Sequence, residues 1–266
     1  MSNSSTRKIG LFIVGDEILS GRREDKHLSK VISMLSSRGI QLSWARFLPD
    51  DLDTLVQEYK RSFASGDIVF SCGGIGATPD DKTRDAVALA LGVELELHPI
   101  AAKLITARFQ ELAKEGRGSI DMGTPENQRR LAMGVFPKGA EIVPNPYNKI
   151  PGFFIQDHTF VPGFPEMAWP MIEWTLDQRY AQYHNLERIE EHSILAYSLP
   201  ESRITPALEF IELNWPGVRT FSLPTVARDN NPPFVDLGVK GPSPAVQEAF
   251  SYLKGEILRA GGRFTF

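Results

Sequence analysis

The stretch Ser71-Cys72-Gly73-Gly74-Ile75-Gly76-Ala77-Thr78-Pro79-Asp80-Asp81-Lys82-Thr83 decides the fold. It follows the apolar run 68–70, and apolar residues with helical spacing follow it at 86–91. A glycine-rich connection from a strand to a helix brings backbone N–H groups and a helix start toward a bound anion. The glycine spacing fits neither a P-loop nor Gly-x-Gly-x-x-Gly. We therefore expect a phosphate-sized cradle of another kind at the carboxyl end of a strand.

Strands and helices alternate on both sides of this stretch. The expected strands before it are 9–14 and 41–47, and helices are expected at 28–35 and 52–63. This order predicts a parallel sheet covered by helices. The expected elements after it are helices 99–115 and 125–133, strand 141–143, a hairpin of 153–155 with 159–161, and helix 165–176, which Pro170 should kink or restart.

A polar stretch at 177–191 separates the first part of the chain from the last. We place a domain boundary here, with an α/β domain at 1–177 and a small α+β domain at 178–266. The second domain is predicted to follow the order β-α-β-β-α. Its expected elements are strand 192–199, a helix around 204–211, strands 218–223 and 234–240, and a final helix around 246–257.

Composition restricts the kind of partner. The 266 residues hold 29 Lys and Arg against 33 Asp and Glu, so the net charge is −4 and argues against generic nucleic-acid binding. The chain has one cysteine, and no run of apolar residues is long enough for a spanning helix. No export signal stands at its start. We expect a cytoplasmic protein with no membrane partner.

Acidic residues gather where the expected strands end. Asp80 and Asp81 are interpreted equally well as acids at a helix start or as a metal site or base beside the cradle. Asp51 is equally well explained as the cap of the following helix. If the six carboxylates at these strand ends all face one edge of the sheet, they suit the binding of hard divalent cations, which in turn hold a phosphorylated ligand. The six carboxylates are Asp16, Glu17, Asp50, Asp51, Asp80 and Asp81.

Several motifs in order resemble the molybdopterin-binding domain family. The similar branch is the N-terminal and middle part of competence/damage-inducible protein A, CinA, without its C-terminal amidase domain. The motifs are Gly15-Asp16-Glu17-Ile18-Leu19-Ser20-Gly21, Gly73-Gly74-Ile75-Gly76, Asp80-Asp81-Lys82-Thr83, Pro125-Glu126-Asn127-Gln128-Arg129, Asn145-Pro146, Pro151-Gly152-Phe153, Pro162-Gly163-Phe164-Pro165-Glu166-Met167 and Glu201-Ser202.

The resemblance implies a fold, a ligand and a chemistry. The fold would be a three-layer α/β domain with a mostly parallel sheet. Family members bind, adenylylate or load molybdopterin, and the CinA-like branch is linked to metal-dependent hydrolysis of ADP-ribose to AMP and ribose 5-phosphate. Such proteins are usually homo-oligomers.

We accordingly expect a small phosphorylated partner and a divalent metal (Mg²⁺, Mn²⁺ or Co²⁺), with molybdopterin as an alternative ligand. The expected catalytic residues are Asp81, Asp16 and Glu17, and the expected metal ligands are Asp50, Asp80 and Asp81. The expected ligand-binding residues are Gly73, Gly74, Ile75, Gly76, Thr78, Thr83, Asn145 and Gly163.

Departures from the family pattern leave three hypotheses open. The chain has Asp25-Lys26-His27 where Asp-x-Asn is common, Asn148-Lys149 in place of Gly-Thr, and Phe164 in the Pro-Gly-Pro-Pro turn. The first hypothesis is a metal-dependent pyrophosphate hydrolase of the ADP-ribose pyrophosphatase type. The second is a non-catalytic molybdopterin- or nucleotide-binding protein, and the third is a structural or regulatory homologue whose site has lapsed. His27 is interpreted as a surface residue in preference to a ligand contact.

Overall fold

The computed structural model describes residues 7–117, 119, 121–184, 189–225 and 232–265. The chain forms two compact units, Met1–His184 and Asn185–Phe266. The boundary predicted after residue 177 lies within helix α7 (Pro165–Arg179), and the division instead follows His184.

A six-stranded sheet forms the centre of the first unit. Its strands are β1 (Ile9–Val14), β2 (Trp44–Leu48), β3 (Ile68–Cys72), β6 (Glu141–Val143), β7 (Gly152–Ile155) and β8 (His158–Val161). They lie in the order β2-β1-β3-β8-β7-β6. The β1–β2, β1–β3 and β3–β8 pairs are parallel, whereas β7 is antiparallel to both of its neighbours. The predicted mostly parallel sheet and the hairpin of β7 and β8 are confirmed.

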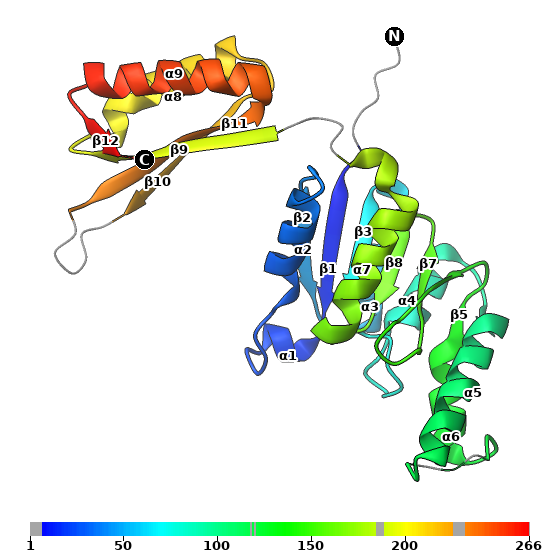
Figure 1. Cartoon of the computed structure of the whole chain (residues 1–266). Coiled ribbons are helices and arrows are strands. Elements are labelled where there is room, and N and C mark those ends of the chain that lie inside the picture. Colours follow the sequence, from blue (N-terminus) through cyan, green and yellow to red (C-terminus); the bar gives the residue numbers. More distant parts are fainter. Residues whose placement is uncertain (1–6, 118, 120, 185–188, 226–231, 266) are drawn as a thin grey trace. The chain divides into compact units, whose positions relative to one another are not determined.

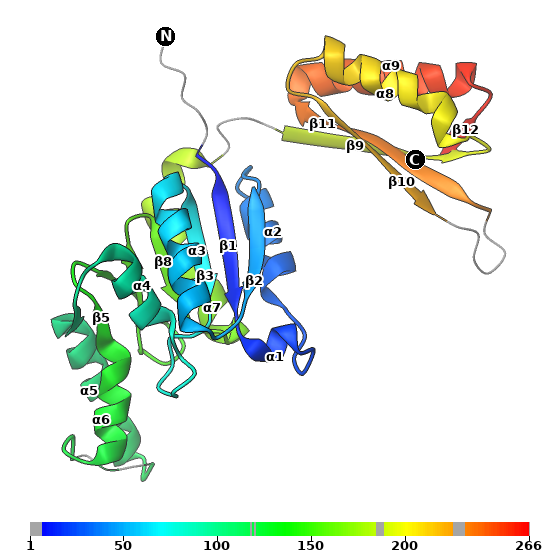
Figure 2. The same cartoon turned by 180° about the vertical axis from the view of Figure 1, so that it is seen from behind.

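Helices cover both faces of this sheet (Figure 1, Figure 2). Alternate residues of β1 face opposite ways because side chains alternate along a strand. Leu11 and Ile13 join a core with α2 (His27–Ser36) and α7. Phe12 and Val14 join a second core with α3 (Leu52–Ser65) and α4 (Thr83–Leu91). The three-layer α/β architecture is confirmed.

The remaining elements of this unit include some that the sequence pattern did not predict. They are α1 (Asp16–Leu19), β4 (Leu95–Leu97), α5 (Pro99–Lys114), α6 (Pro125–Leu131), β5 (Val135–Pro137) and 3-10 helices at Ala132–Gly134 and Ala181–Tyr183. Helices α5 and α6 were expected. The short antiparallel pair β4–β5 and helix α1 were not. Helix α7 does not restart at Pro170, contrary to one of the two expectations for that residue.

The second unit has its own core and sheet. Its elements are β9 (Ile189–Tyr197), α8 (Glu201–Asn214), β10 (Arg219–Thr225), β11 (Phe234–Pro242), α9 (Ser243–Arg259) and β12 (Arg263–Thr265). The strands are antiparallel in the order β10-β11-β9-β12. The predicted β-α-β-β-α order is confirmed, with β12 as an unpredicted addition. In the described parts of both units, every helix is too short or too polar to cross a membrane.

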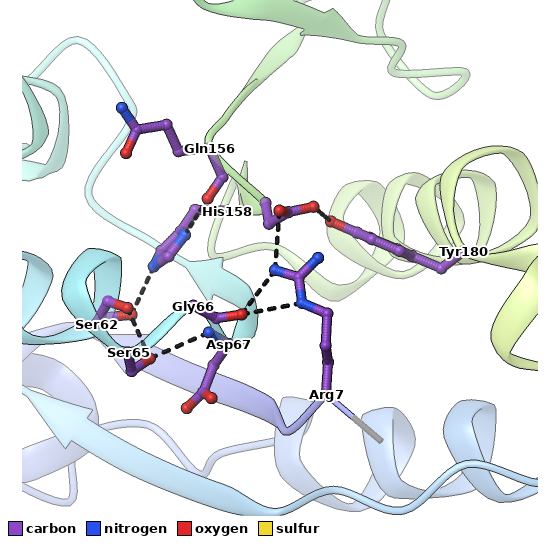
Figure 3. Close-up of polar contacts among 9 residues, drawn as sticks. Arg7, Ser62, Ser65, Gly66, Asp67, Gln156, His158 and Tyr180 are labelled. Atoms are coloured by element: carbon purple, nitrogen blue, oxygen red, sulfur yellow. Dashed lines mark hydrogen bonds and ion pairs between the residues drawn. The ribbon is translucent and has the colours of Figure 1, made fainter. Parts of the chain in front are cut away.

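A partly buried polar network lies at the edge of the first sheet where the parallel strands begin (Figure 3). His158 is 1% exposed, and its Nδ1–H donates to the Gln156 carbonyl oxygen at 2.8 Å. Its Nε2 therefore accepts from the Ser62 hydroxyl at 2.5 Å. Arg7 donates to Gly66 and to Asp157 in the same region. Burial lowers the pKa of His158 to about 4, because the charged ring has lost its water.

This network predicts a stability that depends on pH. As the pH falls below the ordinary histidine value of 6.5, the unfolded chain takes up a proton that folded His158 accepts only near pH 4. The free energy of unfolding should therefore drop by about 2 kcal/mol between pH 7.5 and pH 5. Urea unfolding at both values checks this. His158→Gln should lose that part of the pH dependence, and parallel pH profiles for the two proteins would contradict the assignment.

Candidate functional site

The parallel strands end together at one edge of the first sheet. Val14 is paired with Leu48, and Cys72 is paired with both Ile13 and Val161. The loops that follow β1, β2, β3 and β8 therefore open at the same edge. Parallel α/β sheets bind ligands at this edge. Most of the residues expected in the site stand on these loops.

The loop after β3 passes very close to the end of β1. Gly73 has φ 108° and Gly74 has φ 69°, a region that favours glycine. A Cβ at Gly73 would lie 2.2 Å from the Val14 carbonyl oxygen, and one at Gly74 would lie 2.2 Å from Thr83 Oγ1. Within residues 7–117, the backbone N–H groups of Gly74 and Ile75 donate to no other described group. These two N–H groups are the candidate anion donors.

Asp81 holds this loop in shape. Its Oδ1 accepts from the Gly76 N–H at 2.7 Å, and its Oδ2 accepts from the N–H and hydroxyl of Thr78 at 2.8 and 2.6 Å. Thr83 is fully buried, and its hydroxyl donates to the Gly73 carbonyl oxygen at 3.1 Å. The structure therefore gives Asp81, Thr78 and Thr83 roles in positioning the glycine loop.

Arg84 is a residue of the site that sequence reasoning missed. Its guanidinium is buried beneath the loop and donates to the carbonyl oxygens of Ile75 and Gly76. Burial lowers the pKa of Arg84, because the charge is removed from water. One signal was present in the sequence. An arginine in the first turn of α4 opposes the helix dipole, so its presence there needs another stabilising contact.

Four carboxylates form an acidic cluster, which we define as Asp16, Glu17, Asp50 and Asp80. Asp50 Oδ2 accepts from the Asp16 N–H at 2.9 Å, and Asp16 Oδ1 accepts from the Asp50 N–H at 3.3 Å. The pKa of Asp50 is raised, first by burial and then by the negative charges of Asp16, Glu17 and Asp80, while the hydrogen bond from Asp16 opposes the rise. The carboxylates on the loops after β1, β2 and β3 are thus close enough for their charges to interact.

Two of the six expected carboxylates are engaged elsewhere. Asp51 caps α3 by accepting from the N–H and hydroxyl of Thr54 at 2.9 and 2.6 Å, so the capping alternative is correct for this residue. Asp81 is engaged by its own loop. Among the described residues, no three acidic, histidine or cysteine side chains gather closely enough to hold a metal ion by themselves. The metal roles of Asp50, Asp80 and Asp81 stay predictions.

Asn145 and Gly163 bring two further loops to this edge. Asn145 is 5% exposed, and its side chain bonds Tyr147, Asn148 and Ile150 of its own loop. Asn145 thus shapes that loop. A Cβ at Gly163 would lie 3.5 Å from the Cα of Gly73, so the loop after β8 touches the glycine loop.

The surface interpretation of His27 is wrong. The residue is 4% exposed because the start of α2 packs against the loop after β8, and His27 Nε2 lies 3.1 Å from the Gly163 carbonyl oxygen. Asp25 caps α2 by accepting from the N–H groups of His27 and Leu28 at 2.8 and 3.1 Å. His27 therefore fixes Gly163 at the site.

Asp81 and Asp80 offer a matched pair of substitutions. Both Asp81 oxygens accept from N–H donors, so the amide of Asp81→Asn must place its own NH₂ against one of them. We expect Asp81→Asn to lower the free energy of unfolding by about 1–2 kcal/mol. Asp80→Asn, on the exposed neighbour, should change it by less than about 0.5 kcal/mol. Thermal or urea unfolding measures both, and equal losses would contradict the role given to Asp81.

Comparison with known proteins gives the family. Residues 10–182 match the model of the probable molybdopterin binding domain. A protein of Caldivirga maquilingensis is 30% identical over 76% of this chain and 75% of its own length. A CinA-like protein of Desulforapulum autotrophicum is 31% identical over 80% of this chain, which spans half of that protein's length.

Solved structures agree on the fold. The crystal structure of the protein CinA with unknown function from Thermoplasma acidophilum is similar to this one with a TM-score of 0.54 and 24% identity. The similarity covers 64% of this chain and 98% of that one. The family match extends over the whole sheet and every loop of the candidate site. The chain belongs to the family of probable molybdopterin binding domains.

Proposed function

We propose that the edge of the first sheet binds a small phosphorylated molecule of the nucleotide or pterin type and hydrolyses a pyrophosphate bond in it. The observation that carries the proposal is the position of the Gly74 and Ile75 N–H groups, which have no acceptor in the described protein, next to the acidic cluster. N–H groups at a glycine turn before a helix suit a phosphate. The carboxylates of the acidic cluster could hold a divalent cation or accept a proton from the attacking water.

Charge indicates how a phosphate is accommodated there. The acidic cluster would repel a free phosphate, since the charges of its other members add to the effect of burial in raising the pKa of Asp50. Mg²⁺ binds through one or two carboxylates together with waters and substrate phosphates, so a cage of three side chains is not needed. Asp50, Glu17 and Asp80 are the residues that would hold such a cation. Once bound, it supplies charge neutralisation of the phosphoryl oxygens and lowers the pKa of a coordinated water.

Different groups of the protein bind the phosphate, position the glycine loop and accept the proton in the proposed reaction. The Gly74 and Ile75 N–H groups orient one phosphate, and Asp81 and Arg84 keep the loop that carries them in place. A carboxylate of the acidic cluster accepts a proton from water as the water oxygen attacks phosphorus. The bridging P–O bond breaks, and its electron pair stays on the departing phosphate. With ADP-ribose as substrate, the products are AMP and ribose 5-phosphate.

A second candidate function is a carrier that binds molybdopterin or a nucleotide without turnover. The specific observation that favours it is the engagement of both Asp81 oxygens by the loop, which leaves this expected catalytic residue saturated with hydrogen bonds. The family match to molybdopterin binding domains supports such a ligand.

The test is release of AMP from ADP-ribose by the full chain with Mg²⁺, Mn²⁺ or Co²⁺ and with a chelator. Glu17→Gln and Asp80→Asn should each lower turnover by at least about tenfold, because they remove proton acceptors or metal ligands and leave the loop bonds of Asp81 intact. The control is Asp177→Asn, near the far end of α7, where the carboxylate pairs only with Arg38 at 2.7 Å among described groups.

The outcomes separate the two candidates. Metal-dependent release that falls in both site variants and persists in Asp177→Asn supports hydrolysis. No release with any metal, together with a pterin or nucleotide that stays bound through purification, supports the carrier. Metal-independent release, or release unchanged in both site variants, would overturn the hydrolase proposal.

A further inference from the structure

Phe164 presents an aromatic ring to solvent beside the glycine loop. It follows Gly163, whose contact with Gly73 places the Cα of Phe164 within roughly 9 Å of that loop. The residue is 52% exposed, although its backbone is fixed by hydrogen bonds. The Phe164 carbonyl oxygen accepts from the N–H groups of Met167 and Ala168 at 3.0 and 2.9 Å, and His27 holds the preceding residue. The backbone that carries the ring is therefore fixed at this edge, and the ring is part of neither core.

Arg23 lies over the same ring. Its guanidinium carbon is 5.6 Å from the ring centroid, and its backbone N–H donates to the Glu17 carbonyl oxygen at 3.0 Å. The ion pair between the Arg23 and Glu17 side chains is long, at 3.9 Å. The guanidinium is therefore free to move off the ring or to stack on the other side of a flat group. The Phe164 ring and the Arg23 guanidinium both offer planar faces on which a flat group can stack.

We infer that Phe164, with Arg23, stacks against the planar heterocycle of the bound ligand, a purine or a pterin, while the glycine loop holds its phosphate. The inference rests on the proposed phosphate site and adds the part of the ligand that the glycine loop does not contact.

The chemistry of stacking sets the expected selectivity. A flat heterocycle gains by covering an exposed aromatic face, and base–aromatic stacking contributes enough to change affinity by about tenfold or more. Purines and pterins are both flat heterocycles, so stacking on Phe164 should favour phosphates that carry such a ring over phosphates that do not. A single exposed apolar residue needs no function by itself. The position of Phe164 next to Gly163, which contacts the glycine loop, and the pairing of its ring with Arg23 distinguish it.

The experiment compares phosphorylated ligands with and without a planar ring. Ribose 5-phosphate shares the ribose and phosphate of AMP, and neopterin monophosphate provides the pterin. Calorimetric titration of the full chain should show tighter binding of AMP or neopterin monophosphate than of ribose 5-phosphate. Phe164→Ala should reduce that preference by about tenfold and leave ribose 5-phosphate binding unchanged. Phe164→Tyr should keep the preference.

A control and a second readout isolate the ring. Leu19→Ala removes an equally exposed side chain, at 52%, from α1 at the same edge and should leave the preference intact. Phe164→Trp should add a fluorescence emission that AMP or the pterin quenches and ribose 5-phosphate does not.

Three outcomes are decisive. A preference that falls in Phe164→Ala alone supports stacking, and the ligand that loses affinity identifies the ring class. Phosphate binding by the native chain with an undiminished ring preference in Phe164→Ala overturns the stacking inference and leaves the proposed site standing. Failure of the native chain to bind all three probes, with and without Mg²⁺, overturns the proposed site and the inference with it.

Discussion

The close approach of two strand ends leaves no space for a side chain at Gly73. A Cβ at Gly73 would lie 2.2 Å from the Val14 carbonyl oxygen, so a methyl group there would push the loop after β3 away from the end of β1. The loop after β8 reaches the same place, because Gly163 comes within van der Waals contact of the Gly73 Cα. The acidic cluster, the free N–H groups and the ring of Phe164 all depend on that convergence. The packing of the strand ends and the geometry of the site therefore both depend on the contacts that Gly73 makes.

Hydrophobic spacing predicted most of the fold. The apolar runs of β1 and β3 are buried on both faces, so their sequence is continuous and easily recognised. Helices α3 and α9 have long amphipathic repeats. By contrast, β4 and β5 are three residues each and pair with partners about forty positions apart in the chain, so no local periodicity marks them. The boundary between the units was misplaced because α7 continues into the polar stretch.

The sequence predicted which residues lie at the candidate site, but it did not predict which groups each of them contacts. Sequence places Asp16, Asp50 and Asp81 at strand ends, but loop conformation decides which N–H group each carboxylate meets. Asp81 accepts from its own loop, a contact that needs a residue without a side chain at Gly76, where a Cβ would lie 2.6 Å from Asp81 Oδ2. His27 was misjudged because its burial depends on Gly163, which is distant in sequence. Such pairings follow from packing, and no local pattern contains them.

The positive charge nearest the glycine loop, that of Arg84, lies deeper in the protein than the negative charges around it. The guanidinium lies beneath the glycine loop and bonds carbonyl oxygens, whereas Asp80 and Asp16 stand at the surface. An anion arriving from water therefore encounters negative potential before it feels the compensating charge. Under the proposed function, this order of charges would slow the entry of bare phosphates and favour those that arrive already complexed with a divalent cation.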